Sequence, residues 1–180
     1  MKRYRKAYPA QRPEKPTQFD LKSSKTFAVL LQEGINLNFG VAIDFTVSNQ
    51  PPENANSLHH ISDDGMLNPY QQAIKAIGST IQKFNDDKIV PVYGFGAKVK
   101  YEGFDPEVAN HHFNCNGNLD SPNTFNNKNN LNGVFEAYYK ALKNTTFHGP
   151  TVLCPVVEKF IESINTDSGN LGFMNKYNVL

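Results

Sequence analysis

The amino-acid sequence predicts an α/β fold, a doubly wound and mostly parallel sheet with flanking helices. Two observations support this prediction. Residues 37–44 and 89–94 form short apolar segments with the length and β-branched content of buried strands. Longer segments with apolar residues at helical spacing follow each of them. Strands that alternate with amphipathic helices are typical of parallel sheets covered by helices.

The first predicted strand, residues 37–44, is apolar along most of its length and ends on Asp44. We expect a central strand here, because a strand covered on both faces can be apolar at consecutive positions. A polar loop over residues 46–68 follows. Ligands of doubly wound sheets bind beyond the carboxyl ends of the strands, so Asp44 stands where a binding site is expected.

Three amphipathic helices are predicted. The first begins at Asn68 and Pro69, because Asn is a favourable N-cap and Pro fits the first turn. The second covers residues 132–142, and the third follows Thr151. The residues expected to face inward are Ala73, Ile74, Ile77, Ile81 and Phe84 in the first helix, Val134, Phe135, Tyr138 and Leu142 in the second, and Leu153, Val156, Val157, Phe160, Ile161 and Ile164 in the third.

The remaining segments are predicted from their composition. Residues 1–26 are basic, contain three prolines and lack any regular period, so we expect an extended arm before a domain over residues 27–180. Residues 98–118 are expected to form a loop with a short extended piece around Phe113, and residues 177–180 to begin a further strand. The arm offers four basic candidates for partner contact, Lys2, Arg3, Arg5 and Lys6.

Composition limits the classes of function. Hydrophobic residues are 39% and charged residues 19% of 180, which is typical of a globular chain. The formal net charge of +1 gives no overall field toward nucleic acid or anionic lipid, so no nucleic-acid partner is expected. We find no apolar stretch with the length of a signal peptide or a membrane span, and predict a cytoplasmic location. Two cysteines are too few for a disulfide framework.

Asp44, Thr46 and Ser48 place a carboxylate and two hydroxyls at alternate positions. In an extended loop alternate side chains point the same way, so these oxygens can converge. Hard oxygen ligands suit Mg²⁺. The same three residues also fit an ordinary turn in which the side chains bond their own backbone. From these residues alone, both interpretations stay open.

A wider set of motifs resembles the von Willebrand factor A-like domain of the copine family. One motif is Ala-Ile-Asp-Phe-Thr-Val-Ser at residues 42–48, and another is Gly-Phe-Gly-Ala-Lys at residues 94–98. Similar segments continue in order over residues 57–59, 68–71, 76–78, 133–138, 148–151 and 155–157. The resemblance therefore extends from residue 27 to the last residue, and it implies a Rossmann-like sheet.

The resemblance also implies a metal-ion-dependent adhesion site. Asp44, Thr46 and Ser48 would form its first loop, and Thr151 would match the threonine of the second loop. The family's third loop carries an Asp in a Thr-Asp-Gly stretch that would fall beyond Leu180. We therefore expect an incomplete site with weak Mg²⁺ binding or none.

The same comparison implies a domain that is incomplete at its C-terminal side. Its open strand edge would expose three candidate partner-binding residues, Tyr177, Val179 and Leu180. The C2 domains that precede this domain in copines are not found in the sequence. Membrane binding is not expected without them.

Enzymatic alternatives find little support in the sequence. An aspartate nucleophile at Asp44 would need a second acid at position 46, where Thr46 stands. Adjacent histidines such as His59–His60 and His111–His112 point apart in an extended chain, so we predict surface or loop histidines. Gly94-Phe95-Gly96 is too short for a dinucleotide fingerprint. Cys154 is predicted to be a packed thiol on the inner side of a helix.

Two hypotheses for function follow. The first is a non-enzymatic protein-binding or structural module, a copine-like fragment built into a larger cytoplasmic assembly, with cytoskeletal or ciliary assemblies as examples. The alternative is the Mg²⁺-dependent ligand-binding domain of a copine-like signalling or membrane-trafficking protein. Both predict protein partners and no catalysis.

Overall fold

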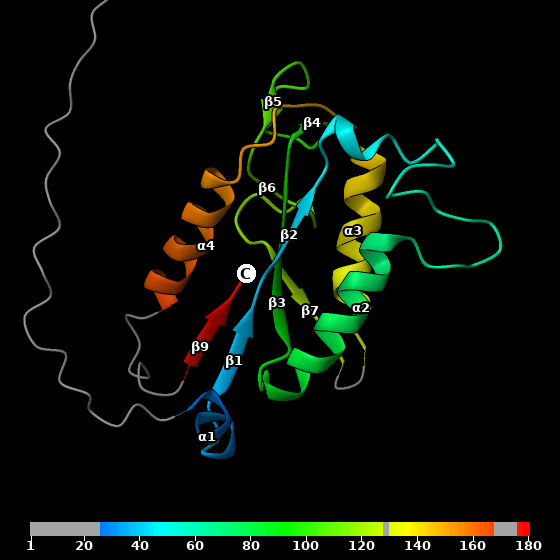
Figure 1. Ribbon diagram of the computed structural model, residues 1–180. Coiled ribbons are helices and arrows are strands. Elements are labelled where there is room, and N and C mark those ends of the chain that lie inside the picture. Colours follow the sequence, from blue (N-terminus) through cyan, green and yellow to red (C-terminus); the bar gives the residue numbers. More distant parts are fainter. Residues whose placement is uncertain (1–25, 128–129, 168–175) are drawn as a thin grey trace, which may run out of the picture.

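The computed structural model describes residues 26–127, 130–167 and 176–180. Within these ranges the protein is a mixed α/β fold (Figure 1). The predicted arm, with Lys2, Arg3, Arg5 and Lys6, lies outside the described residues except for Thr26. Thr26 caps a short helix, α1 (Phe27–Gln32), by accepting a hydrogen bond from the backbone of Val29.

The segment predicted as one strand forms two, β1 (Asn36–Phe39) and β2 (Val41–Asp44), separated at Gly40. Strand β1 pairs in parallel with β9 (Lys176–Val179), whereas β2 pairs in parallel with β3 (Ile89–Phe95). The ring of Phe160 presses on the junction, and a Cβ atom at Gly40 would lie 2.7 Å from it. The chain therefore changes its pairing partner at a residue with no side chain. Figure 1 shows β9, β1 and β3 with the same direction.

Antiparallel strands complete the sheets. Strand β3 also pairs with β6 (Phe113–Asn114) and β7 (Asn123–Phe125). A separate sheet contains β4 (Ala97–Val99) between β5 (Ala109–Asn110) and β8 (Thr145–Phe147). The extended piece at Phe113 is confirmed. The loop predicted for residues 98–118 was too long, because short strands of two or three residues carry too little periodicity to be recognised.

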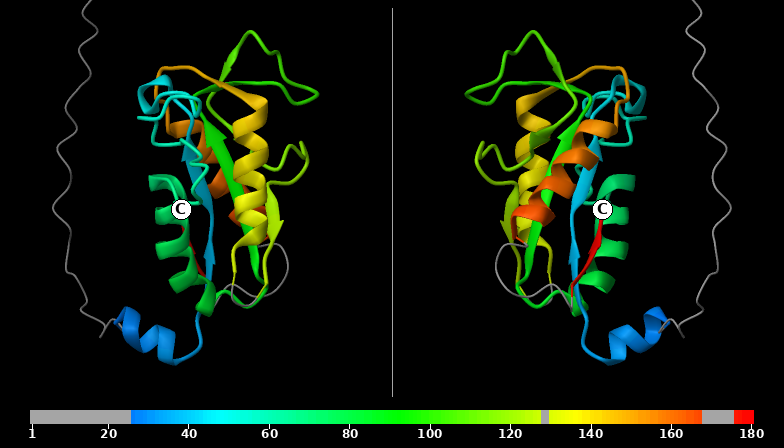
Figure 2. Two further views of the ribbon diagram at one scale, coloured as in Figure 1. Left: turned by 90° about the vertical axis from the view of Figure 1, so that its right-hand side faces the viewer. Right: turned by 90° about the vertical axis from the view of Figure 1, so that its left-hand side faces the viewer.

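Helices pack against two sides of the strands. In the two opposite views of Figure 2, α2 (Pro69–Ile81) and α3 (Asn132–Asn144) lie in front of the strands in one, and α4 (Cys154–Asp167) in the other. Strand β3 contacts both groups. Val90 and Val92 belong to the larger apolar cluster with α2 and α3, and Tyr93 and Phe95 pack with residues of α4. The doubly wound parallel arrangement stays a prediction, because the sheet strands include antiparallel pairs.

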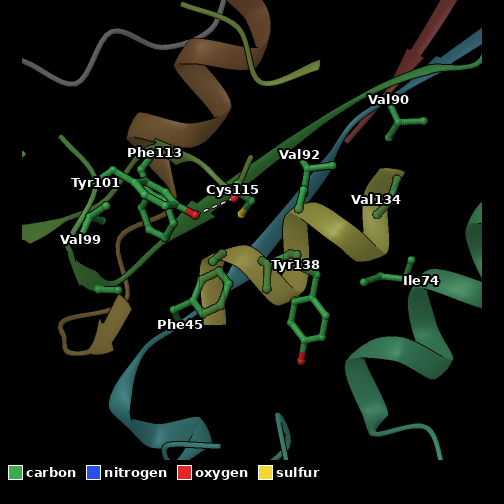
Figure 3. Packing of buried hydrophobic residues seen from close by; sticks show 14 of the residues in the cluster. Phe45, Ile74, Val90, Val92, Val99, Tyr101, Phe113, Cys115, Val134 and Tyr138 are labelled. Carbon is green, nitrogen blue, oxygen red and sulfur yellow. Dashed lines mark hydrogen bonds between the residues drawn. The ribbon is translucent and has the colours of Figure 1, made fainter. Parts of the chain in front are cut away.

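The larger cluster is the main core (Figure 3). Aromatic and β-branched side chains fill it, and the most enclosed of them include Phe45, Phe113, Val134 and Tyr138. Tyr101 lines the same cluster and donates its hydroxyl to the Cys115 carbonyl at 2.7 Å. This pairing satisfies a polar group that would otherwise be costly inside the core.

The predicted helix faces are right in part. Asn68 is the N-cap of α2, and Ile74, Val134, Tyr138, Val156 and Phe160 are buried as expected. Ile77 is 59% exposed, and Leu153, Val157 and Ile161 form an exposed row beside the buried side of α4. The prediction was wrong for these residues because it assigned all apolar positions to one face, whereas each helix contacts the strands through a narrower stripe.

Two further predictions concern single residues. Cys154 is exposed rather than packed, because it is the first residue of α4 and precedes the part of the helix that contacts β3. Tyr177 and Leu180 are exposed, and Val179 packs partly against the core. That these three residues bind a partner stays a prediction.

Among the helices of the described ranges, none combines the length and the apolar character that crossing a membrane requires.

Candidate functional site

The segment after β2 is held between two neighbouring backbones. Phe45 donates its N–H to the carbonyl of Phe95, and Val47 donates its N–H to the carbonyl of His148 at 2.7 Å. The chain then enters the short 3₁₀ helix η1 (Val47–Asn49). Asp44 Oδ1 accepts a hydrogen bond from the Thr46 N–H at 2.8 Å. This last bond is the one that the ordinary-turn interpretation expects, and it occupies only one of the two carboxylate oxygens of Asp44.

Three hydroxyl groups gather beside this turn. The Thr46 Oγ1 and Ser48 Oγ atoms are 3.0 Å apart, and Thr151 Oγ1 lies 3.4 Å from Thr46 Oγ1. Thr46 is buried, whereas Ser48 and Thr151 are exposed. The structure thus brings the two loops of the predicted site into contact, although 105 positions separate Thr46 from Thr151.

The donor set fits a small hard cation. Asp44 supplies a carboxylate, and Thr46, Ser48 and Thr151 supply neutral oxygens. Neighbouring oxygens around an octahedral Mg²⁺ ion are about 3 Å apart. The separation of 3.0 Å between Thr46 Oγ1 and Ser48 Oγ is compatible with that arrangement. Across the described residues, no group of three or more His, Cys, Asp or Glu side chains gathers.

Gly96 allows the two loops to meet. Its φ of +78° lies in the left-handed region, and a Cβ atom there would stand 2.3 Å from Thr46 Cγ2. Its carbonyl accepts the N–H of His148, which begins the loop that leads to Thr151. The Gly149–Pro150 peptide bond of this loop is cis. A side chain at residue 96 would separate Thr46 from its neighbours.

The main-chain carbonyl of Asp44 accepts three hydrogen bonds. The donors are Asn49 Nδ2 at 3.1 Å, His59 Nε2 at 2.9 Å and Tyr70 Oη at 3.2 Å. A carbonyl oxygen can only accept, so His59 Nε2 carries a proton in this arrangement. The backbone of Asp44 is therefore fixed from three directions.

His59 is enclosed in the core and has no exposed surface. Its ring stacks on Tyr70 with the ring centroids 3.9 Å apart. Its second nitrogen, Nδ1, accepts from the hydroxyl of Tyr138 at 2.9 Å, and that hydroxyl accepts from Asn68 Nδ2 at 3.1 Å. Burial lowers the pKa of His59 to about 4, against the opposing effect of the Asp44 carbonyl and charge. His59 is therefore neutral at pH 7.

His59 lies in a loop, as one of the two predicted positions had it, but it is buried there and not at the surface. Sequence reasoning also did not connect Tyr70, Tyr138 and Asn68 with the loop, although it placed Asn68 at a helix start and Tyr138 inward. The only local signal was the capping pattern of Asn68 and Gln71, whose side chains each bond the backbone of the other residue. Contact between residues 59 and 138 depends on the tertiary fold.

Comparison with known proteins gives the family. Residues 57–180 match the sequence model described as Copine. Two relatives from Arabidopsis thaliana, Protein BONZAI 2 and Protein BONZAI 1, are 42% and 40% identical over 132 residues, which is 73% of this chain and 21% of each relative. The chain belongs to the copine family, which confirms the resemblance inferred from the sequence. It spans about a fifth of the length of these curated relatives.

The matched segment includes some parts of the site and not others. Thr151 and the supporting residues His59, Tyr70 and Tyr138 lie within residues 57–180. The loop from Asp44 to Ser48 precedes the matched residues. Family membership alone therefore does not assign the metal site. The support for it comes from the positions of the four residues in the structure.

Proposed function

We propose that this chain is a non-enzymatic protein-binding module whose ligand-binding centre is a Mg²⁺ site at Asp44, Thr46, Ser48 and Thr151. The observation that supports it is the gathering of three hydroxyls from two distant loops, with separations of 3.0 and 3.4 Å. Membership of the copine family supports a role in protein interaction. We further propose that the domain has the doubly wound sheet of a von Willebrand factor A-like fold, supported by helices on two sides of β3.

The chemistry of the residues indicates the kind of ligand. A bound Mg²⁺ ion would supply a positive centre that one protein carboxylate neutralises only in part. Ser48 and Thr151 are exposed, so a partner can approach the centre from solvent. An oxygen ligand with negative charge, such as an Asp or Glu side chain of a partner protein, matches these requirements.

Thermal unfolding with and without metal tests the proposal. A ligand that binds only the folded state raises the melting temperature, so Mg²⁺ or Mn²⁺ at millimolar concentration should raise that of the wild-type chain. Asp44→Asn keeps an oxygen acceptor for the Thr46 N–H and removes the charge, and should abolish the shift. Ca²⁺ and added NaCl serve as controls for ion size and ionic strength. An equal shift in both proteins, or none in either, contradicts the proposal.

A second candidate function is a structural subunit of a larger cytoplasmic assembly, cytoskeletal or ciliary assemblies being examples. The observation that favours it is an exposed apolar row made of Leu153, directly before α4, and of Val157 and Ile161 on α4, whose side chains are 53%, 40% and 51% exposed. Adjacent exposed apolar side chains are typical of a surface that another chain covers. Light scattering of the purified chain across a roughly hundredfold range of concentration tests this idea, and a monomer at every concentration would contradict it.

A further inference from the structure

We infer that His59 is a positioning residue of the proposed metal centre, which holds Asp44 in the orientation that presents its carboxylate beside the three hydroxyls. The inference rests on the proposed function. It adds a role for a buried residue that donates no ligand and lies 15 positions from Asp44.

Asp44 is held at both of its polar groups. Its carbonyl receives the bonds from Asn49, His59 and Tyr70, and its Oδ1 atom receives the N–H of Thr46. Among the described residues, no hydrogen bond is directed to the other carboxylate oxygen, Oδ2. The backbone is therefore locked while one carboxylate oxygen stays open to a ligand.

Two of the three carbonyl donors link the loop to the rigid part of the fold: Tyr70 reaches the carbonyl directly from α2, and His59 reaches it with its second ring nitrogen bound to Tyr138 in the core. Asn49 belongs to the short η1 helix of the loop itself. His59 is fully buried. Its hydrogen bond to Tyr138, on α3, is continued by the bond between Tyr138 and Asn68, the N-cap of α2. Tyr138 has no exposed surface either. The position of the Asp44 carbonyl is thus set by two helices that pack in the main core.

Residues that orient a metal ligand without touching the ion commonly change metal affinity by about 10- to 100-fold. A residue that only fills the core would behave differently, because its loss would lower stability and leave the affinity of the folded molecules unchanged. Metal affinity and stability must therefore be measured on the same variants.

Two substitutions at residue 59 separate these roles. The side-chain amide of Gln can reach the position of the imidazole Nε2, so His59→Gln can retain the donor to the Asp44 carbonyl. The shorter side chain of His59→Asn cannot reach it, although it remains polar and buried. Tyr138→Phe keeps the ring and removes only the hydroxyl that orients His59. Ser79→Ala, on the exposed side of α2, is the matched control.

The experiment is a Mn²⁺ titration of the full chain followed by electron paramagnetic resonance of the free ion, with near-ultraviolet circular dichroism to confirm folding. We expect His59→Asn to bind Mn²⁺ about 10- to 100-fold more weakly than wild type, His59→Gln to recover most of that loss, and Tyr138→Phe to fall between them. Wild-type affinity in folded His59→Asn and Tyr138→Phe overturns the inference alone. If His59→Asn does not fold, the Mn²⁺ affinity of Tyr138→Phe tests the inference in its place. A wild-type chain without saturable Mn²⁺ binding overturns the proposed function as well.

Discussion

At the scale of single residues, the polar groups around Asp44 form a connected and largely buried set. His59 donates to the Asp44 carbonyl and accepts from Tyr138, and Tyr138 accepts from Asn68. Every nitrogen of His59 has a partner in the neutral form. A proton added to Nδ1 would face a tyrosine hydroxyl that then loses its acceptor, at a position enclosed by the core.

The buried His59 predicts a dependence of stability on pH in metal-free buffer. Its pKa is about 4 in the folded chain, against the ordinary histidine value of 6.5 in an unfolded chain, so only the unfolded chain takes up a proton between these limits. The contribution of neutral His59 to the free energy of unfolding is fully present above pH 6.5 and is lost as the pH falls toward 4. Over this range it amounts to about 3 kcal/mol. Urea unfolding in EDTA at several pH values from neutral down to about 4.5 measures it.

His59→Gln is the control for this titration, because it retains bulk and polarity but cannot take up a proton. The difference in the free energy of unfolding between wild type and His59→Gln should shrink as the pH falls from neutral to about 4.5. Parallel curves for the two proteins would show that His59 does not cause the loss.

At the scale of elements, α4 shows how one helix can hold two apolar rows with different roles. Phe160 is 7% exposed and packs against Tyr93 and the Gly40 junction, whereas Ile161 is 51% exposed. Neighbouring residues of a helix point about 100° apart. Substitutions at these two positions therefore compare the buried row with the exposed row at nearly the same place along the helix.

Phe160→Ala should lower the free energy of unfolding by about 3–5 kcal/mol, because it removes a buried ring and leaves a cavity beside β3. Ile161→Ala should change it by less than about 1 kcal/mol in the isolated chain. Urea titration of both variants measures the difference. Similar losses for the two would mean that the exposed row is covered in solution, which would support the assembly candidate.

The sequence predicted some of these elements well and others poorly, for physical reasons. The start of α2 could be predicted because Asn68 and Pro69 carry a local capping signal. The convergence of Thr46 and Thr151 followed from the family resemblance, since nothing local relates two residues on different loops. The exposed row of α4 and the burial of His59 could not be predicted, because both depend on which surfaces the tertiary fold brings together.

At the scale of the whole molecule, the two cysteines report on the integrity of the core. Cys154 is exposed at the start of α4, whereas Cys115 has no exposed surface and lies among the main core residues. Burial also raises the pKa of the Cys115 thiol, which lowers the fraction of reactive thiolate.

Thiol labelling should therefore occur in two phases. Under native conditions one equivalent of a reagent such as DTNB should react rapidly at Cys154, and Cys115 should react only as fast as the core opens. Cys154→Ser should remove the fast phase and keep the slow one. Rapid modification of both thiols in native buffer would contradict the described packing around Cys115.

Strand β1 receives its backbone partner from β9, near the other end of the described chain. On the ribosome, β1 is complete long before Lys176 has been made. The backbone groups of β1 that pair with β9 therefore stay unpaired while the intervening chain is synthesised. An unpaired edge can recruit an incorrect strand, and a contact so distant in sequence forms slowly. The productive folding of this domain is thus a late event, and its first strand is the segment that a chaperone would have most reason to protect.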